Sequence, residues 1–72
     1  MMLIKAVISS VDIATQSAEL ILPEYDGAVT GNIPFYIRPW QEPIKAEDVP
    51  GMIGEFVVFG VFGDDWNDGV IL

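Results

Sequence analysis

The C-terminal part of the chain constrains the fold most, because it has the pattern of two apolar strands joined by an acidic loop. We expect the strands over residues 55–62 and 69–72, with a loop of three aspartates and one tryptophan between them. Neither strand alternates cleanly between apolar and polar residues, so both faces of this hairpin need cover. In so short a chain, we expect one face to line the core and the other to meet another chain.

The size of the chain leaves its own core marginal. A chain of 72 residues buries only roughly 60% of the surface that it exposes when unfolded. The sequence has no cysteine and no histidine, so disulfides and thiolate or imidazole zinc sites cannot supplement the core. Oligomerisation is the remaining supplement, and a composition of 51% hydrophobic and 19% charged residues fits it. We therefore expect a homo-oligomer.

The charge of the chain restricts its partners. Three basic residues stand against eleven acidic ones, for a net charge of −8. Nucleic-acid binding depends on lysines and arginines that neutralise phosphates, so we expect neither a nucleic-acid partner nor an anionic membrane. A charged partner would be basic. The apolar N-terminus is short and interrupted by Lys5, unlike a secretory signal, and we expect assembly in a host cytoplasm.

The rest of the sequence predicts further strands. Residues 3–11 and 17–22 are rich in β-branched and aliphatic residues and indicate an antiparallel pair. A turn follows at 23–27, where proline and Asp-Gly favour tight backbone geometry. The third strand is expected over 32–38. Pro34 inside it cannot donate a ladder hydrogen bond, so this strand should lie at an edge or contain a bulge.

The connection before the last hairpin excludes a long helix. Residues 39–54 contain three prolines and two glycines, which leave room for one helical turn at 45–48. Five short strands with one long connection predict an all-β fold, a small five-stranded antiparallel barrel in which closure removes exposed sheet edges. An oligonucleotide/oligosaccharide-binding (OB) barrel is favoured, with an SH3-like barrel as the alternative. We expect residues 1–72 to form a single domain.

The order of these motifs resembles a known family. The segments that carry the resemblance are Ile4-Lys5-Ala6-Val7 with Ala18-Glu19-Leu20-Ile21-Leu22-Pro23, Thr30-Gly31-Asn32-Ile33-Pro34, Val49-Pro50-Gly51-Met52-Ile53-Gly54-Glu55-Phe56-Val57-Val58-Phe59, and Gly63-Asp64-Asp65-Trp66-Asn67-Asp68-Gly69-Val70-Ile71-Leu72. Together they resemble the small OB-type barrel of spike and baseplate hub proteins in contractile phage tails. The resemblance covers nearly the whole chain.

The resemblance implies a structural role in a virion. In that family the barrel is a docking collar that trimerises around the tail axis and performs no chemistry. Family members continue into a β-helical needle, whereas this sequence stops at Leu72, so we expect a barrel that docks without a needle. A head–tail connector or capsid-decorating protein is the first alternative. A nucleic-acid or sugar module of the OB type is the second.

The acidic loop is the one candidate for metal chemistry. Alignment of Gly69 with the glycine of an EF-hand loop places Trp66 at a ligand position. We therefore expect an ordinary hairpin loop whose Asp and Asn side chains bond their own backbone. Without histidine or cysteine, a general base or nucleophile would have to be serine, lysine or a carboxylate, and no spacing pairs them. We expect no metal, no cofactor and no enzymatic activity.

The aromatic residues near the C-terminal hairpin are the candidate partner-binding residues: Phe59, Phe62, Trp66 and Trp40. Tryptophan is enriched among the residues that dominate binding at protein interfaces. Alternatively, each tryptophan folds back as a lid over one end of the barrel. For Trp66 both interpretations stay open, and for Trp40 the lid is favoured.

Overall fold

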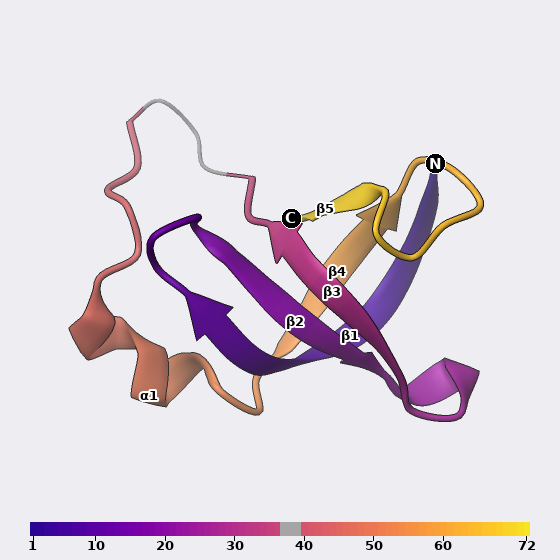
Figure 1. Ribbon diagram of the computed structural model, residues 1–72, viewed down its shortest axis with the longest axis horizontal. Coiled ribbons are helices and arrows are strands. Elements are labelled where there is room, and N and C mark those ends of the chain that lie inside the picture. Colours follow the sequence, from indigo (N-terminus) through magenta and orange to yellow (C-terminus); the bar gives the residue numbers. More distant parts are fainter. Residues whose placement is uncertain (37–39) are drawn as a thin grey trace.

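The computed structural model describes residues 1–36 and 40–72. It contains one sheet of five antiparallel strands in the order β3-β2-β1-β4-β5, curled into a partial barrel (Figure 1). The strands are β1 Met2–Asp12, β2 Ser17–Leu22, β3 Ala28–Pro34, β4 Phe56–Val61 and β5 Gly69–Ile71. The prediction of an all-β, barrel-like fold is confirmed.

Strand β1 makes the sheet curl, because it pairs with a different neighbour along each half. Its first half pairs with β4, from Met2 opposite Val61 to Val7 opposite Phe56. Its second half pairs with β2, and the register shifts between Ile8 and Ser10. Such an irregularity bends a strand and increases its twist. One long strand thereby belongs to both sides of the barrel.

The two edge strands of the sheet, β3 and β5, approach each other through the residues that follow β3 in the sequence. Phe35 forms a parallel bridge with Ile71, and the Tyr36 N–H donates a hydrogen bond of 2.8 Å to the Ile71 carbonyl oxygen. This contact joins the segment after β3 to β5. The bridge and the hydrogen bond therefore partly close the curled sheet between its two edge strands.

The predicted third strand, 32–38, was misplaced along the chain. Strand β3 begins at Ala28 and ends at Pro34, and residues 37 and 38 lie outside the described residues. The strand begins early because the turn is tight: Asp26 and Gly27 both have positive φ, and the Gly27 N–H donates to the Leu22 carbonyl. Local turn chemistry thus set the start of the strand.

The expectation that this strand lies at an edge or contains a bulge is confirmed. Strand β3 lies at one end of the strand order, and its register with β2 shifts between Glu19 and Ile21. Inside the bulge, the Leu20 N–H donates to the buried Thr30 hydroxyl at 3.0 Å. The same hydroxyl donates to the Gly31 carbonyl at 2.8 Å. The threonine side chain replaces the backbone partner that the bulge displaces.

The core consists of the inward-facing residues of the strands. Successive residues of a strand point to opposite faces, and the inner positions are aliphatic or aromatic. The buried hydrophobic residues are Ile4, Ala6, Ile8, Ala18, Leu20, Leu22, Ile33, Phe59, Val61 and Ile71. Phe35 and Met52, both in the connection between β3 and β4, and Trp66, in the loop between β4 and β5, pack against them. The barrel interior is therefore filled by side chains.

The connection between β3 and β4 closes one end of the barrel. It contains a 3₁₀ turn, Ala46–Asp48, followed by the four-residue helix α1, Val49–Met52. The predicted helical turn is present, but the limit of one turn is wrong: Val49–Met52 adds an α-helical turn that has a proline at its start, where proline is tolerated. The Gln16 side chain fixes this connection: the Ile44 N–H donates to its Oε1 at 2.7 Å, and its Nε2 donates to the Ile44 carbonyl at 3.0 Å.

Candidate interaction surface

The outward positions of the sheet form a second apolar surface, which we call the outer apolar face. These positions alternate with the core positions along the same strands, and none of the side chains is buried to the depth of the core. The members are Leu3, Val7, Ile21, Val29, Phe56, Val58, Phe62, Val70 and Leu72. The described chain therefore has apolar side chains on both faces of one sheet.

The strand register makes this face continuous. Val7 lies opposite Phe56 on one side and opposite Ile21 on the other, and Ile21 lies opposite Val29. These four residues form one row across β4, β1, β2 and β3. Opposite residues of antiparallel strands have Cβ atoms about 4.5–5.5 Å apart. Neighbouring side chains of the row are therefore in contact range.

A second row crosses β1, β4 and β5. Lys5 lies opposite Val58, and the Leu72 N–H donates to the Val58 carbonyl oxygen at 2.9 Å. Val58 is thus flanked by Lys5 on one side and Leu72 on the other. The row places a single cation inside an otherwise apolar area.

The charges of the chain lie mostly away from this face. Nine of the eleven acidic residues fall in the turn 23–27, the connection 40–55 and the loop 63–68. Among the described residues, Lys45 pairs with Glu42 at 3.5 Å, and Lys5 forms no ion pair. A partner that covers the outer apolar face therefore meets one unpaired ammonium group and no cluster of carboxylates.

The two predicted phenylalanines lie on different faces. Phe62 belongs to the outer apolar face and is 61% exposed, whereas Phe59 is 0% exposed. Phe59 fills the core and does not reach that face. The sequence prediction missed Phe56, which is 67% exposed. The period of two along a strand would have placed Phe56 opposite in direction to Phe59, once Phe59 is assigned to the core.

The two tryptophans also differ. Trp66 is half-buried, packs against the core and meets the Tyr25 ring edge-to-face with centroids 4.7 Å apart. It is a lid over its end of the barrel. Trp40 is 78% exposed, so the lid that was favoured for Trp40 is wrong. Phe35 and Met52 pack against the core in its place.

The acidic loop is a hairpin loop, as predicted. Its backbone bonds its own carboxylate: the Asn67 N–H donates to Asp65 Oδ1 at 3.0 Å. The loop also reaches across to β3, because Asn67 Oδ1 accepts a 2.7 Å hydrogen bond from the Gly31 N–H. Over residues 1–36 and 40–72, no three acidic side chains form a group that could hold a metal ion.

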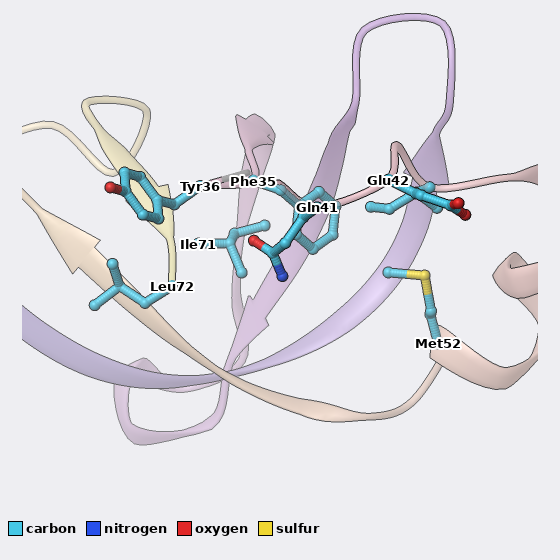
Figure 2. Close-up of a pocket in the computed structure, with 8 residues that line it drawn as sticks. Phe35, Tyr36, Gln41, Glu42, Met52, Ile71 and Leu72 are labelled. Atoms are coloured by element: carbon cyan, nitrogen blue, oxygen red, sulfur yellow. The ribbon is translucent and has the colours of Figure 1, made fainter. Parts of the chain in front are cut away.

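A cavity of about 270 Å³ opens at the barrel end near α1 (Figure 2). Its lining is Phe35, Tyr36, Gln41, Glu42, Ile44, Met52, Ile71 and Leu72. Figure 2 shows Tyr36 and Leu72 at one end of this lining and Met52 at the other. The volume is just below the range of about 300–1,000 Å³ typical of small-molecule sites. Leu72 also belongs to the outer apolar face.

Comparisons with known proteins identify no relative. No family model matches the chain, and neither a curated protein nor a solved structure matches it. Within the described residues, no helix is long and apolar enough to cross a membrane.

Proposed function

We propose that this chain is a structural subunit that acts through protein–protein contacts and carries out no chemistry. The single observation behind the proposal is the outer apolar face. Its exposed members include the large side chains Leu3, Phe56 and Phe62. Monomeric proteins rarely expose contiguous apolar patches beyond a few hundred Å², and larger ones mark interaction sites.

The area of the chain allows such an interface. A standard specific interface buries about 800 Å² on each partner, which is roughly a sixth of the 4617 Å² accessible surface of this chain. Burial of an exposed leucine or phenylalanine contributes about 1.5–3 kcal/mol. Association itself costs about 4–15 kcal/mol of translational and rotational freedom, so several side chains of the outer apolar face would have to be buried together.

The assembly we propose is a phage or phage-like tail, with this chain as a baseplate hub or spike-type docking barrel. Support comes from the order of the sequence motifs and from the five-stranded barrel-like sheet that they form. A head–tail connector or capsid-decorating protein would use the same surface. Fractionation of purified particles into heads and tails, followed by detection of this chain, distinguishes these roles.

The decisive experiment is site-specific photo-crosslinking in cells that produce the particles. A photoreactive phenylalanine analogue replaces Phe56 on the outer apolar face, and the matched control places it at Glu24, in an exposed acidic turn. We expect crosslinks to virion proteins, including this chain itself, from position 56 above the level at position 24. Equal crosslinking from both positions would contradict a docking role for this face.

A fluorescence titration tests the alternative of an OB-type binding module. Trp66 and Trp40 report on their surroundings, and the outer apolar face offers only Lys5 to a phosphate backbone. We expect no saturable change on addition of an oligonucleotide or an oligosaccharide at low salt, where phosphate contacts are strongest. Saturable quenching would contradict the structural-subunit proposal and favour a binding module of the OB type.

A further inference from the structure

We infer that the cavity beside α1 is a second docking site, which takes one large apolar side chain next to a positive charge on a basic peptide segment of a partner protein. The cavity shares only Leu72 with the outer apolar face. The inference therefore goes beyond the proposed function, because it does not require that face to bind anything. It follows from the walls of the cavity, its size and its charge.

The apolar back of the cavity belongs to the folded barrel. Ile71 is fully buried, and Phe35 packs against the same core. Phe35 forms a bridge with Ile71, and the Tyr36 N–H donates to the Ile71 carbonyl oxygen at 2.8 Å. The Met52 side chain, at the end of α1, lies at the far end of the lining (Figure 2). These side chains are therefore held in place before any partner binds.

The other wall of the cavity is the segment that contains Gln41, Glu42 and Ile44. The Gln16 side chain anchors this segment, because its amide accepts from the Ile44 N–H at 2.7 Å and donates to the Ile44 carbonyl at 3.0 Å. Ile44 is half-buried, whereas Gln41 and Glu42 are exposed. The polar residues of the lining therefore lie on its solvent side, and an apolar group that enters passes them first.

The size of the cavity fits a side chain better than a free small molecule. A cavity of about 150 Å³ holds benzene, so about 270 Å³ accommodates a phenylalanine, leucine or methionine side chain. Small-molecule sites are larger and enclose most of the ligand. Half of this lining is exposed: Tyr36, Gln41, Glu42 and Leu72. A side chain held by the rest of a bound segment does not depend on such enclosure, and interface anchors commonly fill pockets of this kind.

The charge around the cavity selects a basic segment. Glu42 is the one charged side chain among the described residues of the lining. Its neighbour Lys45 lies 3.5 Å away, but the two side chains are 83% and 58% exposed. Exposed pairs of this kind contribute little, so a cation of the partner can replace Lys45. Four acidic residues stand against one lysine in the connection 40–55: Glu42, Glu47, Asp48 and Glu55 against Lys45. An anionic segment would meet carboxylates there.

The experiment is an NMR titration of the full, ¹⁵N-labelled chain with three capped tripeptides at about 20 mM salt. The first peptide has phenylalanine between two lysines, the second has phenylalanine between two glutamates, and the third has alanine between two lysines. We expect the first to shift the amide signals of Tyr36, Ile44 and Leu72 saturably, and to bind more weakly at about 500 mM salt. The second should bind at least about tenfold more weakly, and the third, which lacks the anchor, should not saturate.

Two pairs of variants locate the binding. Glu42→Gln removes the charge of the lining and should weaken the first peptide roughly two- to fivefold, while Glu47→Gln makes the same change outside the lining and should have little effect. Met52→Trp fills the cavity and should abolish saturable binding, whereas Ile53→Trp, at the exposed neighbouring position, should not. The amide spectrum of each variant establishes that it is folded, and the glutamate pair decides the question if Met52→Trp is not.

The outcomes separate this inference from the proposed function. Equal binding of the lysine and glutamate peptides, or equal effects of Glu42→Gln and Glu47→Gln, would overturn the inference. Saturation by free phenethylamine as tight as by the first peptide would replace the peptide with a small amine. The absence of saturable shifts in the lining would overturn the site altogether. Crosslinks from position 56 test the outer apolar face independently, and their absence would leave the peptide titration unchanged.

Discussion

The two faces of strand β4 are similar in composition but differ in what covers them. Phe59 points inward and is completely buried, while Phe56, three residues earlier, points outward and is mostly exposed. Both are phenylalanines in one six-residue strand. The side of the curled sheet on which a residue lies therefore decides whether its side chain is buried in the core or stays exposed.

The outer face stays uncovered because the described chain has no second layer. The helix α1 has only four residues, and its Met52 packs at the end of the core instead of across the sheet. Phe35 and Trp66 likewise pack against the core. The two connections that carry these residues therefore pack against the inside of the barrel. No connection of the described chain packs across the outer apolar face.

Alanine substitution of the two phenylalanines should separate the inner from the outer side of β4. Phe59→Ala removes a fully buried ring, and such truncations cost about 3–5 kcal/mol of unfolding free energy. In a domain of this size, that change is expected to unfold much of the population. Urea denaturation followed by circular dichroism, at a dilution where the chain is monomeric, measures it.

Phe56→Ala is the matched variant on the outer face. Surface substitutions usually change stability by less than about 0.5 kcal/mol, so the monomer should unfold as the parent does. A loss of stability comparable to that of Phe59→Ala would show that the outer face belongs to the folding core of the monomer.

The sequence predicted the strands well because their signals are local. Four of the five strands and the helical turn followed from β-branched runs and from proline and glycine positions. The third strand was misplaced, since its start depends on a tight turn with positive φ at Asp26. The faces were harder to predict. Whether Phe59 or Phe56 lines the core depends on pairing with β1, which is far away in the sequence.

Gly69 offers a second test, because it begins β5 directly beside β4, opposite Val61. A Cβ at this position would collide with the Gly60 carbonyl and lie 2.6 Å from the Phe59 ring. We expect Gly69→Ala to lower the unfolding free energy by about 1–3 kcal/mol, as overpacking does. Gly51→Ala is the control: a Cβ at position 51 would have no neighbouring atom within 4 Å, and alanine in α1 should be neutral or stabilising by up to about 1 kcal/mol.

The stability of Gly69→Ala shows whether the core requires β5 to lie so close to β4. If β5 can slide outward at little cost, Gly69→Ala will unfold with nearly the parent's free energy, and the close approach of the two strands is then not required by the core. The same denaturation experiment on both glycine variants decides this. Equal changes of unfolding free energy in Gly69→Ala and Gly51→Ala would contradict the prediction that the core requires glycine at position 69.

A single hydrogen bond ties the loop between β4 and β5 to β3. Asn67 Oδ1 accepts the Gly31 N–H at 2.7 Å on an exposed part of the molecule. A typical hydrogen bond of this kind contributes about 0.5–1.5 kcal/mol, so Asn67→Ala should reduce stability only slightly. Its local effect should be larger: hydrogen exchange of the Gly31 amide, measured by NMR, should accelerate because local opening exposes that amide to water. Asn67→Asp keeps an acceptor oxygen and should preserve the protection. Unchanged exchange in Asn67→Ala would mean that Trp66, through its contacts with Tyr25 and the core, holds the loop over the inner face without help from Asn67.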